Sequence, residues 1–260
     1  MNIVVVSPHR DDAAFSLGLS IRGWLADGYA VSVLNCFTRS IYAPFSDAES
    51  LHSNDRMSYV TALRLREDEL WLRQCGRGMT LLDLRLKDAP IRLRCSIDEL
   101  SEIEVDPTDK AIGKIRSALS DLSMDALVLP LAFGNHVDHR TARDAAIACS
   151  NVVLPTAFYE DLPYVSRVTD LSQIESSAQA LDRELIPVYV PVSGPSNIEE
   201  AIATKLGIAL CYDSQIDTAT AQTIANFSRY YGGRERLWTT QAWRDSKLAM
   251  GEESKRKSAS

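Results

Sequence analysis

The sequence predicts an α/β fold: a Rossmann-like, mostly parallel sheet flanked by helices, with extra strands and helices toward the C-terminus. Two observations support this prediction. The predicted strand 2–6 is apolar from residue 3 on, and the run at 126–130 is apolar throughout, as strands buried on both faces of a parallel sheet are. Segments with helical patterning separate the predicted strands. With 260 residues, 45% of them hydrophobic, the chain can build one large core.

The first third of the chain reads as a βαβ unit. The β-branched run 2–6 predicts a strand, and 15–26 predicts a helix with Gly28 just past its end. Residues 30–37 predict a second strand, so the crossover should be right-handed. The polar segment 39–56 then leaves the carboxyl end of that strand. A loop of this length is usually functional or mobile, so we expect it to act as a lid.

The rest of the chain continues the alternation of helices and strands. In order, we predict a charged helix (57–75), a strand (79–83), a helix (107–122), a strand (126–130), a helix (140–150), a strand running into a loop (157–164), a strand (188–192) and a helix (197–210). Residues 84–106 carry no clear pattern. We expect one domain over 1–243, followed by a polar, disordered tail at 244–260.

Composition excludes several functional classes. The net charge of −7 argues against a nucleic-acid surface, which needs a basic patch. The five cysteines are an odd number without a CxxC pair, which fits reduced thiols in a cytoplasmic protein. No basic leader precedes the first apolar run, and no stretch approaches the roughly 20 apolar residues of a membrane span. We therefore expect a cytoplasmic protein without a membrane span or nucleic-acid partner. The sequence leaves the oligomeric state open.

Two short histidine–aspartate motifs carry the chemistry. Residues 7–12 (Ser-Pro-His-Arg-Asp-Asp) follow the first predicted strand, and residues 135–140 (Asn-His-Val-Asp-His-Arg) follow the strand at 126–130. The carboxyl ends of parallel strands form one rim of the sheet, where ligands bind. Both motifs should therefore meet at that rim. Imidazole nitrogens and carboxylate oxygens suit a catalytic zinc ion with room for water.

The first motif offers two different carboxylates. His9 and Asp12 are spaced i, i+3, so a helical turn directs both to one side. Asp11 then points elsewhere, toward whatever the metal holds, where a carboxylate can take a proton from metal-activated water. The alternative is that Asp11 and Asp12 merely cap the helix at 15–26.

The second motif repeats the spacing with His136 and His139. One ring can ligate the metal, while the other, protonated, donates to an oxyanion and gives a proton to a leaving amine. Asp138 can orient a ring nitrogen of a metal-bound histidine. The alternative is an exposed polar loop. Two such motifs, each after a buried strand, favour the metal site.

These motifs resemble those of the PIG-L/LmbE-like family of zinc-dependent de-N-acetylases, some of them bacterial. The family pattern is a strand followed by (A/S)HPDDE, and later HPDH or HVDH before a helix. The resemblance implies hydrolysis of an N-acyl group, most often acetyl on an amino sugar. It implies one Zn²⁺, or another divalent ion, on His9, Asp12 and His139. It also implies Asp11 as general base and His136 as the acid or oxyanion-stabilising group.

Weaker similarities extend over about residues 2–216 and suggest substrate contacts. The segment Arg-Leu-Arg-Glu at 64–67 resembles a family helix whose arginine, here Arg64, faces substrate; a solvated helix face is the alternative. Asp88 lies where an acidic substrate contact is common. The segment Tyr-Glu-Asp-Leu-Pro-Tyr at 159–164 resembles YEDxPY of one bacterial branch. Its Glu160 and Asp161 either line the pocket or cap a turn.

The chain also departs from the family pattern. Ala13 replaces the usual glutamate, which commonly supports the site, and Arg10 replaces the usual proline. We hypothesise that Arg10 binds a carboxylate or phosphate of the substrate. Gly134 stands where some relatives place a tyrosine that binds the oxyanion, so such a donor has to come from elsewhere.

The sequence thus predicts a metal-dependent amidohydrolase. Its substrate is a small-molecule N-acylated amine, an amino sugar or a related natural product. The alternative is a degenerate, non-catalytic binding protein on the same fold, which Ala13 alone supports. A nucleotide-binding Rossmann module would need GxGxxG after the first strand, and none occurs there.

Overall fold

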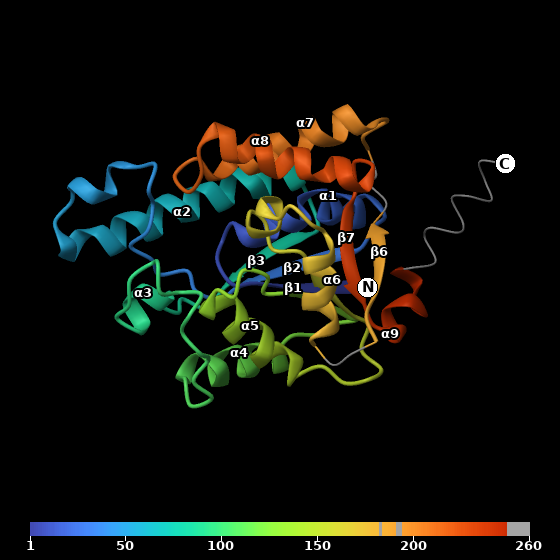
Figure 1. Cartoon of the computed structure of the whole chain (residues 1–260), viewed down its shortest axis with the longest axis horizontal. Coiled ribbons are helices and arrows are strands. Elements are labelled where there is room, and N and C mark those ends of the chain that lie inside the picture. Colours follow the sequence, from blue (N-terminus) through green and yellow to red (C-terminus); the bar gives the residue numbers. More distant parts are fainter. Residues whose placement is uncertain (182–183, 191–193, 249–260) are drawn as a thin grey trace.

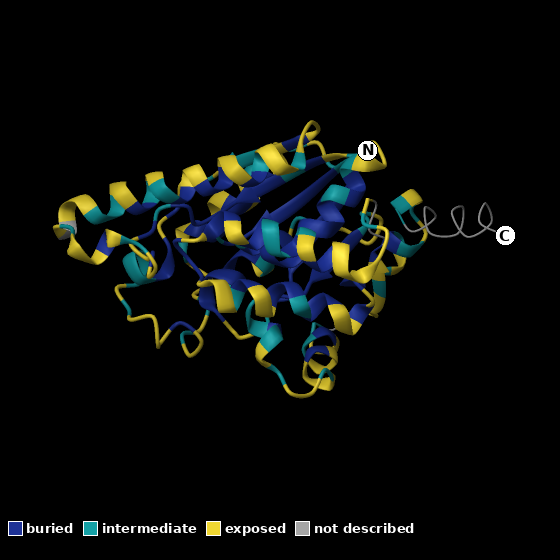
Figure 2. Cartoon of the chain, turned by 90° about the horizontal axis from the view of Figure 1, so that it is seen from above, coloured by how far each residue is buried: buried dark blue, intermediate teal, exposed yellow. Residues whose placement is uncertain are grey.

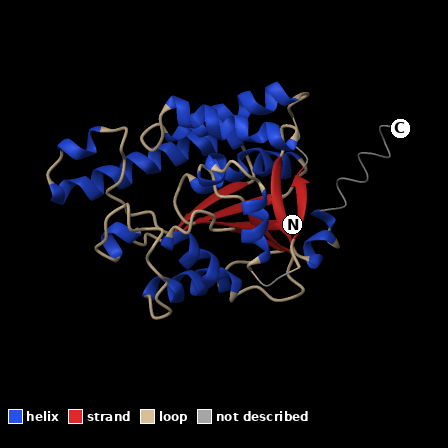
Figure 3. Cartoon of the chain, in the orientation of Figure 1, coloured by secondary structure: helices blue, strands red, loops and turns tan. Residues whose placement is uncertain are grey.

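The computed structural model describes residues 1–181, 184–190 and 194–248. Its centre is a seven-stranded sheet in the order β3-β2-β1-β4-β5-β7-β6 (Figure 3). The strands are β1 (Asn2–Ser7), β2 (Ala30–Asn35), β3 (Met79–Asp83), β4 (Ala126–Pro130), β5 (Thr156–Tyr159), β6 (Ile186–Val190) and β7 (Glu235–Thr239). The pairs joining β3, β2, β1, β4 and β5 are parallel, whereas β7 runs antiparallel to both β5 and β6. The predicted mostly parallel α/β fold is confirmed.

Helices cover both faces of this sheet. The α-helices are α1 (Asp12–Ala26), α2 (Ser53–Cys75), α3 (Ala89–Arg92), α4 (Lys110–Ser120), α5 (Val137–Ile147), α6 (Ser172–Gln179), α7 (Ile198–Ala209), α8 (Thr218–Phe227) and α9 (Gln241–Arg244). Short 3₁₀ turns are η1 (Asp47–Ser50), η2 (Tyr164–Arg167), η3 (Leu210–Tyr212) and η4 (Ser228–Tyr231). Helices α1, α2, α7 and α8 lie on one side of the sheet, and α4 and α5 on the other (Figure 1). Within the described residues, no helix is long and apolar enough to cross a membrane.

The central strands form the core because they are apolar on both faces. Every residue of β4 is buried, as is all of β1 after Asn2. In Figure 2 these strands run dark blue through the middle of the molecule, between helices whose outer faces are exposed. Covering both faces is what a parallel sheet of this kind requires. The carboxyl ends of β1 and β4 lie next to each other, so the two motifs that follow them meet.

The long polar segment after β2 is more ordered than expected. Helix α2 begins at Ser53, earlier than the predicted residue 57, because His52 caps it: its Nδ1 accepts a hydrogen bond from Asn54 N–H at 3.3 Å. Within the segment, η1 is capped by Ser46, whose hydroxyl accepts a hydrogen bond from Ala48 N–H. The sequence-based range 39–56 for one irregular loop is therefore too long.

Strand β7 was not predicted, because its sequence includes charged residues. Both charges are buried and neutralised inside the fold. Glu235 forms an ion pair with Lys205 of α7, and Arg236 forms one with Glu160, just after β5. Lys205 itself is fully buried and serves as a structural ion-pair partner.

The C-terminal boundary also differs from the prediction. Arg244 ends α9, where its guanidinium donates to Thr239 O, and Leu248 packs against the core. Residues 244–248 therefore belong to the folded domain, and the predicted tail does not begin at 244. The remainder of that tail, 249–260, lies outside the described residues.

Candidate metal centre

The loop after β1 directs His9 and Asp12 toward the same space. The Ser7 hydroxyl accepts a hydrogen bond from Ala13 N–H at 3.1 Å, which ties the end of the strand to the start of α1. The backbone N–H of His9 donates to Asp12 Oδ2 at 2.7 Å. These short-range bonds close the loop into one turn, as the i, i+3 spacing predicts.

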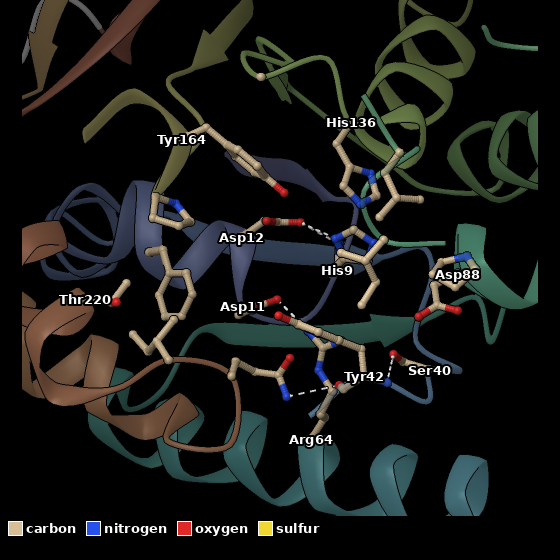
Figure 4. Close-up of a pocket in the computed structure, with 18 of the residues that line it drawn as sticks. His9, Asp11, Asp12, Ser40, Tyr42, Arg64, Asp88, His136, Tyr164 and Thr220 are labelled. Carbon is tan, nitrogen blue, oxygen red and sulfur yellow. Dashed lines mark hydrogen bonds and ion pairs between the residues drawn. The ribbon is translucent and has the colours of Figure 1, made fainter. Parts of the chain in front are cut away.

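Three side chains of the two motifs, those of His9, Asp12 and His139, converge at the carboxyl ends of β1 and β4. Figure 4 shows two of them, His9 and Asp12, side by side. Asp12 Oδ2 lies 3.2 Å from His9 Nδ1 and 3.3 Å from His139 Nε2. The ligand atoms of these three residues all lie within 4.8 Å of one another. Asp12 is almost buried and His139 is fully buried. The structure therefore brings together the metal set that the sequence predicts.

Two further carboxylates orient the imidazole rings from behind. Asp161 Oδ1 lies 2.7 Å from His139 Nδ1, and Asp138 Oδ2 lies 3.1 Å from His9 Nε2. Each carboxylate is itself held by a backbone N–H: that of Phe133 for Asp161 and that of Ala89 for Asp138. A carboxylate on the far nitrogen fixes ring and tautomer in this way at metal sites.

The arrangement fits a divalent cation. His139 Nε2 is buried and has no hydrogen-bond partner among the residues that the structure describes, and it faces the Asp12 carboxylate. With its proton on Nδ1, toward Asp161, the ring presents a lone pair to a negative oxygen. A cation between the two atoms removes that conflict.

Burial opposes a positive charge on the His9 ring, but the hydrogen bonds and charge interactions of His9 with Asp12 and Asp138 outweigh burial and raise its pKa to about 10.

A second possible metal group consists of His9, His136 and Asp138. It suits a metal less well, because the Asp138 carboxylate is already occupied. Besides His9, it accepts from Arg92 Nη1 at 2.6 Å and from the backbone N–H of Ala89 at 2.8 Å. We therefore take His9, Asp12 and His139 as the candidate ligands.

Asp11 lies beside this set rather than within it. It occupies the cap position of α1, but its side chain makes no capping hydrogen bond, which excludes the capping alternative. Instead, Asp11 Oδ1 accepts from Arg64 Nη2 at 2.6 Å. Both side chains line the pocket (Figure 4). The guanidinium thus holds one oxygen of a carboxylate that lines the cavity.

His136 completes the centre from the start of α5. Its Nδ1 accepts a hydrogen bond from the backbone N–H of Asp138 at 3.1 Å, so the proton of a neutral ring sits on Nε2. Burial, then the charges of His9 and His139, lower its pKa to about 3. These surroundings favour a neutral donor over the protonated ring that we expected from the sequence.

Two of the three candidate ligands, His9 and Asp12, line a cavity of about 570 Å³, whereas His139 is fully buried and is not among the lining residues. The lining of this cavity combines charged, aromatic and apolar side chains. The lining residues are His9, Asp11, Asp12, Phe15, Ser40, Tyr42, Phe45, Arg64, Asp88, Pro90, Ile97, Leu100, Ser101, Gly134, His136, Pro163, Tyr164, Arg167, Gln215, Ile216 and Thr220. Asp88 is 4% exposed, and its Oδ1 has no hydrogen-bond partner within the described residues. Burial raises the pKa of this carboxyl. Asp88 therefore has an acceptor to offer a bound molecule.

Two residues predicted to contact substrate lie elsewhere. Arg10 is 2% exposed and forms ion pairs with Asp68 and Asp83, away from the pocket lining, so it cannot bind a substrate anion. Glu160 accepts hydrogen bonds from Tyr231, Trp238 and Arg236 in the core. Both side chains are neutralised by internal partners, which a single sequence does not reveal.

Asp161 is likewise absent from the pocket lining. It is fully buried behind His139, where it orients the imidazole ring instead of contacting substrate.

Tyr164 is a site residue that the sequence reasoning did not single out. Its ring packs where a Cβ on Gly134 would come within 2.8 Å, and Gly134 has φ +87°. The ring lies 5.6 Å from that of His139, and in Figure 4 its hydroxyl points into the space beside Asp12 and His136. Burial, then the negative charge of Asp12, raises the pKa of Tyr164, which therefore stays protonated. The YEDxPY-like segment was the signal that could have found it.

Ala13 does not disturb the metal set. Its side chain is fully buried in the main apolar core, while its backbone N–H binds Ser7. The three candidate ligands keep their geometry without a glutamate here.

Comparisons with known proteins agree with this site. The family model PIG-L, described as GlcNAc-PI de-N-acetylase, matches residues 4–150. A 2'-N-acetylparomamine deacetylase of Streptomyces fradiae is 31% identical over 242 residues, covering 91% of this chain and 80% of the relative. A deacetylase of teicoplanin biosynthesis, solved with teicoplanin, superposes with TM-score 0.67 and 22% identity, covering 92% of this chain and 98% of that one. An A40926 pseudoaglycone deacetylase gives 0.62 and 24%, covering 91% and 96%. The chain therefore belongs to the PIG-L family.

Proposed function

We propose that this protein is a zinc-dependent deacetylase that removes an N-acetyl group from an amino sugar within a small-molecule natural product. The observation that carries the proposal is the site's division of labour. His9, Asp12 and His139 converge as candidate ligands, while Asp11, held by Arg64, lies outside this set and lines the same cavity as His9 and Asp12. Hydrolysis at a metal needs both a ligand set and a separate base.

The ligand set suits zinc, because two imidazole nitrogens and one carboxylate oxygen leave room for water. Bound there, a zinc ion would supply Lewis acidity toward water and toward the acyl carbonyl. One similar solved structure is the zinc-inhibited form of a teicoplanin deacetylase, so the test below measures which metal this protein binds and how much of it.

Asp11 acts as the general base in this proposal. Its free carboxylate oxygen takes the proton of the attacking water and later passes it to the leaving amine, so the same proton leaves with the product. Arg64 holds the other oxygen at 2.6 Å, which keeps the carboxylate aimed at the reacting carbon. Arg64 is then a positioning residue rather than a direct ligand of the substrate.

Two hydrogen-bond donors face the position of the developing oxyanion. One is Nε2–H of His136, whose tautomer is set by the backbone N–H of Asp138. The other is the hydroxyl of Tyr164, which fills the space left open by Gly134. Donors held in place before reaction stabilise an oxyanion without reorganisation.

The cavity supports an amino-sugar substrate. Asp88 Oδ1, which has no hydrogen-bond partner within the described residues, can accept a hydrogen bond from a sugar hydroxyl or from an ammonium group. The aromatic side chains of Tyr42 and Phe45 at the rim can pack against an attached ring. The similar proteins include a 2'-N-acetylparomamine deacetylase and deacetylases of teicoplanin biosynthesis and of the A40926 pseudoaglycone.

The alternative of a non-catalytic binding protein has no support from the geometry, because Ala13 lies in the core and the candidate ligands are intact. We further propose a cytoplasmic, bacterial enzyme, as composition and resemblance suggest. The oligomeric state is left open.

Acetate release tests the proposed function. The purified chain, assayed for bound metal, is given a panel of N-acetylated aminoglycosides, glycopeptide sugars and chitobiose derivatives. We expect turnover of at least one, loss of activity on chelation and recovery with Zn²⁺. Asp11→Asn should keep the metal and lose turnover. Full activity after complete metal removal would contradict the metal-dependent mechanism.

A further inference from the structure

A second hollow lies beside the catalytic cavity and shares none of its lining residues. Its volume is about 340 Å³. It is formed by the segment between β3 and α3, by Arg39 in the loop that follows β2, and by the first turns of α4. The lining residues are Arg39, Arg85, Leu86, Lys87, Arg92, Asp109, Lys110, Ala111 and Lys114.

A single backbone wall separates the two spaces. Arg39 and Lys87 are partners in an isolated parallel bridge, and both line the hollow. The next residue on each side, Ser40 and Asp88, lines the catalytic cavity. Successive side chains of extended backbone point to opposite faces. The same two segments therefore present cations on one side and the catalytic pocket's polar groups on the other.

The charge of the hollow is one-sided. Six of its lining residues are cationic and one is acidic, in a chain whose net charge is −7. The acid, Asp109, is already used: it binds Arg92 Nε at 2.8 Å and caps α4. Among the residues that the structure describes, no acidic side chain pairs with Arg39, Arg85, Lys87, Lys110 or Lys114. A concave surface with unpaired charges of one sign focuses its field on counter-ions.

Several of these cations are held in place by the fold. Arg92 donates to Asp138 at 2.6 Å and to Lys87 O at 3.2 Å, and its guanidinium stacks 4.5 Å from the Phe37 ring centre. Lys110 and Lys114 are one turn apart at the start of α4, so they share a face. The positive end of the α4 dipole adds to their potential.

We propose that this hollow binds a multiply charged phosphate anion, at least a diphosphate group. Its cationic side chains come from three separate segments of the chain, the loop after β2, the residues from 85 to 92 and the start of α4. A single phosphate group would contact only some of them. The guanidinium and ammonium groups match phosphate oxygens. The volume of about 340 Å³ and the net charge of −7 of the whole chain favour a small anion over a nucleic-acid strand. Only Leu86 and Ala111 are apolar among the lining residues, so the hollow itself recognises the anionic group.

The diphosphate could be free or part of a nucleotide, and calorimetry distinguishes these sources. Inorganic pyrophosphate and ADP are titrated into the full chain at physiological ionic strength, with sulfate at matched ionic strength as the reference. We expect saturable binding of pyrophosphate at least about tenfold tighter than that of sulfate. Tighter binding of ADP than of pyrophosphate would identify the nucleotide as the source. Absence of saturable binding for both probes would overturn the proposal.

Matched triple variants locate the binding. Lys87→Ala/Lys110→Ala/Lys114→Ala removes three exposed, unpaired cations from the hollow. Arg66→Ala/Arg77→Ala/Lys247→Ala removes three exposed cations from other surfaces, with the same change in net charge. We expect the dissociation constant for pyrophosphate to rise at least about tenfold in the first variant and less than about twofold in the second. Equal losses in both would show nonspecific attraction and reject the site. Because the readout is binding, it is independent of the deacetylase activity.

Discussion

The guanidinium of Arg10 forms a buried ion pair with Asp68 of α2. One turn earlier on the same helix, Arg64 binds Asp11, the residue that follows Arg10. In the first pair the loop supplies the cation and the helix the anion, whereas in the second pair the loop supplies the anion and the helix the cation. Tyr212 adds a hydrogen bond to Asp68 at 2.8 Å. Helix α2 thereby holds the segment between the candidate ligands His9 and Asp12.

Replacing Arg10 should therefore affect stability and turnover together. We expect Arg10→Met to lower the free energy of unfolding by about 2–4 kcal/mol, because Asp68 loses its buried partner. Urea unfolding measures this change, and kcat at saturating metal should fall as well. The control is Arg73→Met, whose exposed pair with Glu69 at 3.6 Å should contribute less than about 1 kcal/mol. An unchanged kcat for Arg10→Met would show that α2 does not position this loop.

The Asp11–Arg64 pair should govern kcat rather than metal binding. Asp11→Asn should lower kcat by about 10²–10⁴ with the metal content unchanged, since the variant loses the base but no ligand. Arg64→Met should reduce kcat less, because the base remains but loses its orientation. Steady-state kinetics with elemental analysis checks both. Loss of metal in Asp11→Asn would instead assign Asp11 to the ligand set.

The carboxylates behind the histidines should control metal affinity. Asp161→Asn leaves the three candidate ligands in place but weakens the orientation of His139, whose Nδ1 lies 2.7 Å away. We expect about 10–100-fold weaker zinc binding, measured by competition with a chromophoric chelator. Glu160→Gln is the neighbouring control, because Glu160 does not approach the metal set. A zinc affinity equal to that of the wild type in Asp161→Asn would contradict this role.

Tyr164 should contribute to the transition state through its hydroxyl alone. Tyr164→Phe keeps the ring against Gly134 and His139, so the fold should be retained. Removing one oxyanion donor costs about 10²–10³ in kcat. We expect kcat to decrease by at most about 10³-fold, with KM little changed. A change confined to KM would indicate a substrate contact instead.

Glu67 should make the protein less stable as pH rises. Burial, only partly offset by the hydrogen bond from Ser214 N–H, raises its pKa from 4.5 to about 7. Between pH 4.5 and about 7, Glu67 keeps its proton in the folded state but loses it in the unfolded state. The free energy of unfolding therefore falls as pH rises through this range, and the contribution of Glu67 no longer changes above about pH 7. Glu67→Gln should remove this slope, worth about 1–3 kcal/mol. Urea midpoints at several pH values test it, and an unchanged slope would contradict it.

The parallel core was predictable because its signal is local. Strands such as β1 and β4 are apolar at nearly every position, which only burial on both faces explains. Strand β7 was not predictable, since Glu235 and Arg236 look solvent-exposed until their partners Lys205 and Glu160 are known. Those partners are distant in sequence, and one chain gives no sign of the pairing.

The sequence by itself predicted that the two motifs meet, because each follows a buried strand and parallel strands end on one rim. The i, i+3 spacing placed His9 and Asp12 on one side, and the family resemblance selected His139 over His136 as the third candidate ligand. Tertiary structure alone decided what the remaining charges do. Arg10 turned inward to Asp68, and Asp161 turned to His139 instead of the substrate. Such roles depend on which opposite charge lies within a few ångströms after folding, and sequence spacing does not encode that distance.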